Sequence, residues 1–255
     1  MKIPFKNSFD NARTYDKYAN YTLYTSTIIL IVAFIIQAIN KDWSYISDFL
    51  NSFNSFFILG YAILEFTIQH IFYEASIQKR YDFIDNSFET SFSEENSTEY
   101  FTNDDIEKGV YKMAVNGFEN SLFTYNISKR MVKSIWIKNI IIGFLFLGIS
   151  IAGFNNVFVM LFQLSLPLLL LYQALKLTIF VNRINKVYEN YRRLFQDLKN
   201  KKKRKSKKPE ILINVIEYES TLSWGGIILD NDIYEKLNPK LSEKWNKMKI
   251  KYEIK

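Results

Sequence analysis

Two adjacent apolar runs, residues 135–154 and 157–180, constrain the fold of this chain more than any other feature. A helix needs roughly 20 apolar residues to cross the hydrocarbon core of a bilayer, so each run is long enough by itself. Only Asn155 and Asn156 separate them. The sequence therefore predicts a tight helical hairpin over residues 135–180 that turns on one side of a membrane.

A second pair of runs lies earlier in the chain, at about residues 23–39 and 49–73. The second of these contains Glu65 and several Asn and Ser residues. Its Phe, Ile and Leu residues favour insertion and can offset one carboxyl group, which costs about 2.5–3.5 kcal/mol. The four runs together predict an all-α membrane protein with four transmembrane helices arranged as two hairpins.

Charged residues are concentrated between the runs, as in a membrane protein with sizeable aqueous segments. We expect five segments: a cytoplasmic N-terminal segment (1–20), hairpin 1 (21–75), a cytoplasmic insert (76–134), hairpin 2 (135–180), and a helical extension with a basic linker and tail (181–255).

Helical periodicity and turn residues predict the elements outside the bilayer. Residues 81–107 hold nine acids and no Lys or Arg, which indicates a loop. From residue 103 the periodicity predicts a helix that continues into the third span, and the fourth span is expected to extend to about Leu198. In the tail we expect one helix ending at Gly225 and Gly226, a short helix at residues 232–237, and a last helix capped by Asn238 with Pro239 in its first turn.

The distribution of Lys and Arg predicts the orientation. Four bases precede the first span, four lie near the start of the third, and five lie at the exit of the fourth, whereas the two opposite loops contain only Lys41. By the positive-inside rule both termini and the insert are cytoplasmic. The N-terminal residues have no short apolar core with a cleavage site, so no removable signal peptide is predicted. The expected location is the bacterial inner (plasma) membrane, crossed several times.

The sequence contains no pattern that predicts catalysis. There is no cysteine and only one histidine, His70, which excludes thiolate zinc sites and cysteine nucleophiles. Walker, GxGxxG and HExxH motifs are also missing from the sequence. We therefore expect a non-enzymatic protein with no metal and no cofactor.

Glu65 is the strongest single candidate, because an ionisable group within a span is costly and usually faces a partner, a cavity or a pore. Lys176, near the cytoplasmic end of the fourth span, is a possible ion-pair partner. The alternative is that Lys176 extends to the interface and that Glu65 is protonated or bonded to a Ser or Gln. Pro167 can kink the fourth span and so act as a hinge or only as a packing feature.

A basic run connects the fourth helix to the tail, with eight bases in ten residues. They are Lys199, Lys201, Lys202, Lys203, Arg204, Lys205, Lys207 and Lys208. An anionic leaflet would attract the run by about 1 kcal/mol per base near the surface. The alternatives are docking against the acidic insert of the same or a neighbouring subunit, or a solvated linker. Nucleic acid is disfavoured, because no aromatic residue interleaves the run.

The arrangement resembles a known family, the bacterial four-transmembrane effectors encoded beside cyclic-oligonucleotide synthases in anti-phage systems. The polar approach NARTYDKYANYTLY, the two hairpins and the segment EASIQKRYDFIDNSF after the second span are similar to that family. The resemblance implies an effector that damages the inner membrane, and it transfers no ligand-binding residue to this chain.

The expected function is a non-enzymatic effector that oligomerises and forms a pore or disrupts the membrane when its cytoplasmic part receives a signal, in anti-phage defence. Its expected partners are the lipid bilayer, copies of itself, and a cytoplasmic ligand or protein. The alternative is a membrane anchor or assembly subunit that recruits a cytoplasmic partner through the insert and tail. A small transporter ranks third, since it would show more polar residues at mid-membrane and a repeat.

Overall fold

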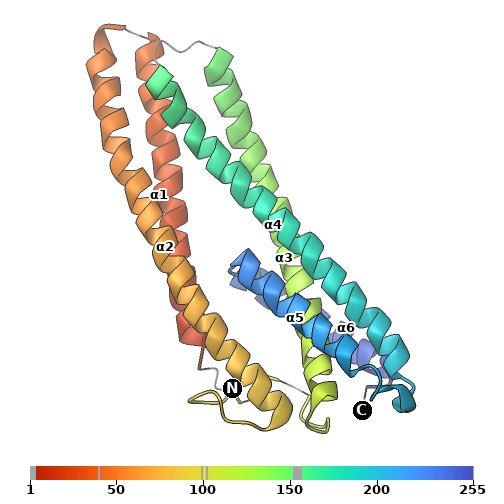
Figure 1. The fold of residues 1–255 in the computed structure, drawn as a ribbon. Helices are drawn as coiled ribbons and strands as arrows, with labels where there is room; N and C mark the ends of the chain where they lie inside the picture. Colours follow the sequence, from red (N-terminus) through yellow and green to blue (C-terminus); the bar gives the residue numbers. More distant parts are fainter. Residues whose placement is uncertain (1–3, 40, 99, 102, 152–156, 255) are drawn as a thin grey trace. The chain divides into compact units, whose positions relative to one another are not determined.

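The structure is a computed structural model that describes residues 4–39, 41–98, 100–101, 103–151 and 157–254; the side chains of residues 38, 41, 145–151 and 157–167 lie outside the description. The described residues form six α-helices: α1 (Lys6–Ile39), α2 (Ser44–Phe88), α3 (Val110–Ile151), α4 (Val157–Leu198), α5 (Lys208–Gly225) and α6 (Asn231–Tyr252) (Figure 1). Two short 3-10 helices, η1 (Lys41–Trp43) and η2 (Lys201–Lys203), precede α2 and follow α4. The all-helical prediction is confirmed.

Among the described residues, two helices are long and apolar enough to cross a membrane, within Lys6–Gln37 and Ser44–Phe88. Only 33% of the most apolar stretch of the first helix is buried. The corresponding stretch of the second helix is 11% buried. The core helix of a soluble protein would instead be mostly buried. The predicted turn at Asn155 and Asn156 lies outside the described residues.

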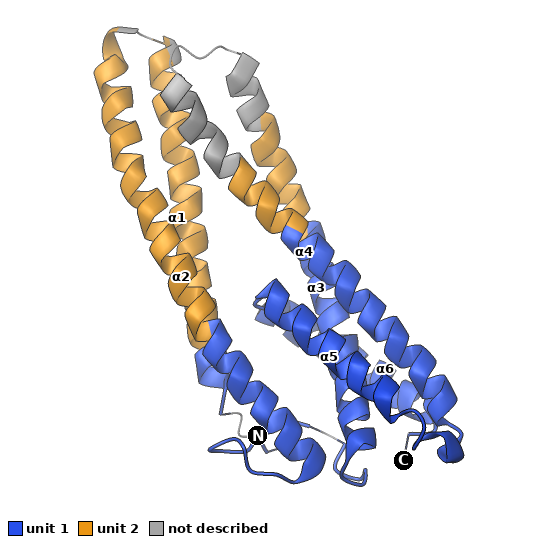
Figure 2. Ribbon diagram, viewed as in Figure 1, with its two compact units in different colours: residues 1–9, 72–133, 176–255 blue, residues 10–71, 134–175 orange. Residues whose placement is uncertain are grey.

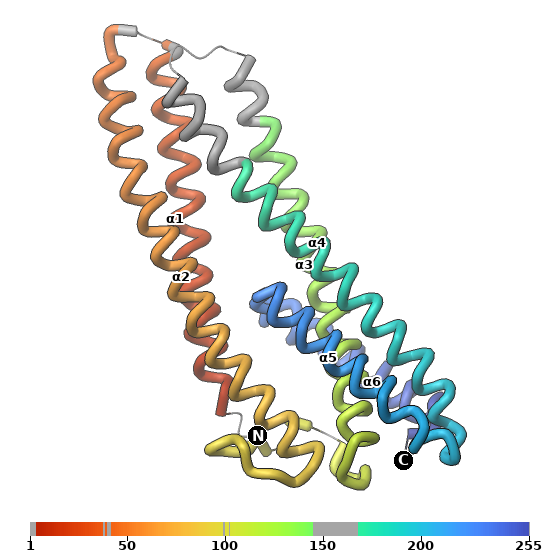
Figure 3. Tube along the Cα trace, viewed as in Figure 1, coloured from red at the N-terminus to blue at the C-terminus, as the bar shows by residue number. Residues whose placement is uncertain are grey.

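The chain divides into two compact units (Figure 2). Unit 1 contains residues 1–9, 72–133 and 176–255, and unit 2 contains residues 10–71 and 134–175. Long helices pass from one unit to the other without interruption, as the Cα trace shows (Figure 3).

Aromatic side chains form the core of unit 1, where α5 and α6 pack with parts of α3 and α4. The fully buried ring of Phe118 lies 4.9 Å from that of Phe195, 5.5 Å from that of Trp245 and 5.9 Å from that of Tyr191. Such rings contribute large buried areas together with favourable edge and stacking contacts. The core therefore joins α3, α4 and α6 through rings that are far apart in the sequence.

The end of α5 agrees with the prediction at Gly225 and Gly226. Gly226 has φ 53°, and its N–H donates to the carbonyl of Leu222, as in a left-handed helix cap. A Cβ on Gly225 would lie only 2.4 Å from a ring carbon of Phe180. The glycine therefore allows α5 to approach α4 closely.

Several predicted helix ends were wrong. Residues 81–88, predicted as loop, are the last two turns of α2, and α3 begins at Val110 rather than at residue 103. The two last helices predicted in the tail are a single continuous helix, α6, with Asp230 as its N-cap and Pro239 inside it. The extension of α4 to Leu198 and the continuity of the insert helix into the third apolar run are confirmed.

Candidate functional site: a polar stripe on α2

Within unit 2 the two faces of α2 have the opposite polarity to that of a soluble helix. The outer, mostly apolar face contains Phe49, Phe53, Phe56, Leu59, Ile63 and Phe66, which are 44–78% exposed, with the exposed Ser52 and Ser55 between them. The inner face, here called the polar stripe, consists of Ser47, Asn51, Asn54, Ile58, Tyr61, Glu65 and Ile68, all buried or half-buried. Phenylalanines outside and polar groups inside indicate that the outer face contacts lipid or another apolar surface.

One set of buried positions repeats every seven residues along each helix of the α1–α2 hairpin. On α2 these are Ser47, Asn54, Tyr61 and Ile68, and on α1 they are Ala12, Ala19, Ser26 and Ala33. A seven-residue repeat is the spacing of a coiled-coil seam, and small residues allow two helices to approach closely. Thr22 Cγ2 accordingly lies 4.0 Å from the place that a Cβ on Gly60 would occupy.

Five buried side-chain atoms in this hairpin have no hydrogen-bond partner among the described residues: Arg13 Nε, Ser26 Oγ, Ser47 Oγ, Asn51 Oδ1 and Asn54 Oδ1. Ser26, Ser47 and Asn54 are each only 1% exposed. A buried polar group without a partner costs about 1–3 kcal/mol. Three of these groups, on Ser26, Ser47 and Asn54, occupy the seven-residue seam and therefore demand an explanation beyond helix packing.

Glu65 belongs to a hydrogen-bonded group at one end of the polar stripe. Gln69 Nε2 donates to one carboxylate oxygen at 3.1 Å, and the Tyr61 hydroxyl lies 3.4 Å from the other. Gln173 Nε2 of α4 donates to the Tyr61 hydroxyl at 2.8 Å. The group thus connects α2 to α4 within unit 2, and the bond from Gln69 agrees with the alternative of a Gln partner for Glu65.

The other predicted residues of the spans lie on α4. Lys176 is half-buried and belongs to unit 1, so its predicted ion pair with Glu65 of unit 2 stays a prediction. Pro167 lies within the helical range of α4, and its side chain is outside the described residues.

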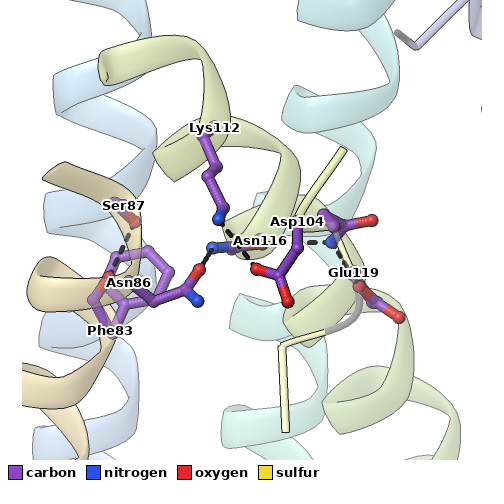
Figure 4. Close-up of polar contacts among 8 residues, drawn as sticks. Phe83, Asn86, Ser87, Asp104, Lys112, Asn116 and Glu119 are labelled. Carbon is purple, nitrogen blue, oxygen red and sulfur yellow. Dashed lines mark hydrogen bonds and ion pairs between the residues drawn. The ribbon is translucent and has the colours of Figure 1, made fainter. Parts of the chain in front are cut away.

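A second group of polar contacts lies in unit 1, between the end of α2 and the start of α3 (Figure 4). Lys112 Nζ is 3.0 Å from Asp104 Oδ1, and its side chain is fully buried, whereas that of Asp104 is 71% exposed. Asn116 Nδ2 donates to Asn86 Oδ1 at 2.9 Å, and Asn103 Nδ2 donates to Asn116 Oδ1 at 3.0 Å. These bonds attach the segment between α2 and α3, residues 89–107 and here called the acidic segment, to both helices.

Two buried carboxylates at the end of α2 organise the same acidic segment. Asp85 accepts backbone N–H bonds from Phe92 and Ser93, both at 2.8 Å, and Asp82 accepts one from Ser97 at 2.7 Å. Burial raises the pKa of Asp85, but these bonds outweigh burial and hold its pKa below the ordinary value. The acidic segment is therefore folded back on α2 by its own carboxylates.

The basic run forms an ordered turn around η2. Lys207 Nζ lies 2.6 Å from carboxylate oxygens of both Asp197 and Glu210, and these bonds raise the pKa of Lys207 to about 12. The Arg204 guanidinium stacks 3.7 Å from the ring centre of Tyr111. The remaining exposed bases are Lys201, Lys202, Lys203, Lys205 and Lys208.

The distance along α4 separates this run from the predicted end of the fourth span. Phe180 and Leu198 are 18 residues apart on one helix, which is about 27 Å at 1.5 Å per residue. Charge interactions in water are largely screened beyond about 8–10 Å. Measured along α4, the run therefore lies beyond this screening distance from the predicted end of the fourth span.

Sequence reasoning identified Glu65 but missed the polar stripe. Asn51 and Asn54 were interpreted only as polar interruptions of a span, and the part played by Gln173 was not predicted. The signal was present in the seven-residue recurrence of Ser47, Asn54 and Tyr61.

Comparisons of the chain with protein-family models, with curated proteins and with solved structures found no match. The resemblance to the four-transmembrane effectors stays an expectation from the sequence.

Proposed function

We propose that this chain is a non-enzymatic effector of the bacterial inner membrane that self-associates and permeabilises the bilayer when its cytoplasmic unit receives a signal, in anti-phage defence. The observation that carries the proposal is the reversed polarity of α2, with phenylalanines outside and a polar stripe inside. A simple anchor needs an apolar exterior, but it has no need of unpartnered polar groups in its seam.

The proposed topology has four spans, both termini in the cytoplasm, and unit 1 on the cytoplasmic side. The continuous helices α2, α3 and α4 link the two units, so a change in unit 1 can be transmitted along them. The exposed bases around η2 and the acidic segment are the proposed surfaces for the signal, whether ligand or protein. Glu65 lines the path across the membrane, and Pro167 permits movement of α4.

Regulated expression in bacteria tests the proposal. Membrane potential and growth are recorded with and without phage infection. Loss of potential that accompanies growth arrest is expected. Unchanged potential and growth under every activating condition, phage infection included, contradicts the proposal.

The alternative, a membrane anchor or assembly subunit that recruits a cytoplasmic partner through the insert and tail, is favoured by the acidic segment of unit 1, which Asp82 and Asp85 hold against α2. Recovery of one stoichiometric partner, with no change in permeability, would support it over the effector.

A further inference from the structure

We infer that the polar stripe of α2 is the lining of a cation path, closed in this structure by contact with the small residues of α1. The inference rests on the proposed function, because permeabilisation requires a path across the membrane. It adds the class of permeant solute, the lining residues and the contact that closes the path.

The length of the polar stripe fits a bilayer. Ser47 and Ile68 are 21 residues apart on α2, which corresponds to about 32 Å. The hydrocarbon core is about 30 Å thick. Five of the seven residues of the stripe are polar, and they extend from Ser47 to Glu65, about 27 Å along α2, so one face of a single helix presents hydrogen-bonding groups across most of the core.

Glu65 gives the path its selectivity for cations. It is the only Asp or Glu in the four apolar runs. Carboxylates in a pore favour cations and repel anions. The bonds from Gln69 and Tyr61 hold the carboxylate on the stripe side of α2 and away from the apolar face.

The contact with α1 closes the path. Ala12, Ala19, Ser26 and Ala33 are buried on α1 with the same seven-residue spacing as the stripe, and Thr22 approaches Gly60 of α2. No described group meets the hydrogen-bonding needs of Ser26 Oγ, Ser47 Oγ and Asn54 Oδ1. Separation of α1 from α2 would expose these atoms to water, which satisfies such groups in protein interiors. The unpartnered atoms thus lower the cost of opening.

Reversal potentials test the selectivity. The full chain is reconstituted in planar bilayers of phosphatidylethanolamine and phosphatidylglycerol across a KCl gradient, where the current is expected to reverse near the K⁺ equilibrium potential. Glu65→Gln should lower the K⁺ over Cl⁻ permeability ratio by about tenfold, and Asn54→Asp should raise it. Glu74→Gln, which changes an exposed carboxylate outside the stripe, is the matched control and should leave the ratio unchanged.

A disulfide tests the closing contact. Because the chain has no cysteine, Thr22→Cys with Gly60→Cys provides a single possible bridge between α1 and α2. Oxidation should abolish the current and reduction should restore it, whereas each single variant should conduct under both conditions.

The outcomes separate the two proposals. A current without cation preference, or one unaffected by Glu65→Gln, Asn54→Asp and the disulfide, overturns the cation path and leaves the proposed function standing. No permeability in bilayers and none in expressing cells overturns the proposed function, and the path with it.

Discussion

Lys112 is a charged residue whose side chain is fully buried, and its described ion pair is with the exposed carboxylate of Asp104. Removal of one partner of a buried ion pair leaves a charge without compensation, whereas replacement of the buried charge by an apolar side chain is often neutral or stabilising. The pair therefore contributes little net stability, but Asp104 has a large effect when it is removed alone.

The pair predicts an asymmetry between two variants. Asp104→Ala should lower the free energy of unfolding of unit 1 by about 2–4 kcal/mol, since it leaves the Lys112 ammonium buried and unpaired. Lys112→Met should change it by less than about 1 kcal/mol in either direction. Thermal unfolding of the detergent-solubilised chain measures both; equal losses in the two variants would contradict this account.

Asp85 makes a pH-dependent contribution to stability. Its pKa in the folded chain is below the ordinary value of 3.8, so its contribution is fully present above that value and is lost as the pH falls through the lower folded pKa. Stability should therefore decrease as the pH is lowered below about 4. Asp85→Asn should be less stable at neutral pH and should lose part of this acid dependence.

Limited proteolysis of residues 89–107 measures how firmly Asp85 holds this segment against α2. Asp85→Asn should be cut faster than the unmodified chain at neutral pH, and Glu89→Gln, a change of an exposed carboxylate in the same segment, should not. Equal cleavage of the Asp85→Asn variant and the unmodified chain would contradict its role.

At the scale of elements, the apolar runs and helical periodicity predicted the helices well, because both signals are local in the sequence. The predicted helix ends were wrong where contacts with residues distant in the sequence determine where a helix begins or ends. Asp82 and Asp85 lie in an acidic stretch whose composition predicts a loop. They are nevertheless buried at the end of α2, because backbone N–H groups of the following loop donate hydrogen bonds to their carboxylates. Pro239 predicted a helix start, but α6 continues through it, with Trp245 and Tyr252 packed in the core.

The same limit applies to the candidate site. The cost of a carboxylate in a span identified Glu65 from the sequence alone. The polar stripe could not be predicted without knowing which face of α2 is buried. Asn54 and Ser55 are adjacent in the sequence, but only Asn54 is buried.

Gly225 provides a test of helix packing. Gly225→Ala should destabilise unit 1 by about 1–3 kcal/mol, because the new Cβ would collide with the ring of Phe180. Gly143→Ala is the matched control: it also lies in a helix, but a Cβ there meets nothing within 4 Å. Thermal unfolding should show a loss for Gly225→Ala alone, and a similar loss for Gly143→Ala would contradict the packing argument.

At the scale of the whole molecule, the proposed topology puts the apolar face of α2 in the bilayer and the basic run in the cytoplasm. Replacement of Lys201, Lys202 and Lys203 by Gln should leave the dependence of permeabilisation on anionic lipid unchanged, because the run is about 27 Å along α4 from the predicted interface. Liposome leakage at several phosphatidylglycerol contents measures this dependence. A weaker dependence on anionic lipid in the triple variant would contradict this expectation and would indicate that the basic run contacts the leaflet.

The orientation of α2 in the bilayer tests the central claim most directly. Single cysteines are introduced along residues 47–68 of the cysteine-free chain and spin-labelled in liposomes, and their accessibility to oxygen and to a water-soluble nickel reagent is measured. Labels at Phe49, Phe56, Ile63 and Phe66 should be accessible to oxygen and not to nickel, and labels at Ser47, Asn54 and Tyr61 should be protected from both in the resting state. Nickel access along the apolar face, or oxygen access along the polar stripe, would contradict the account.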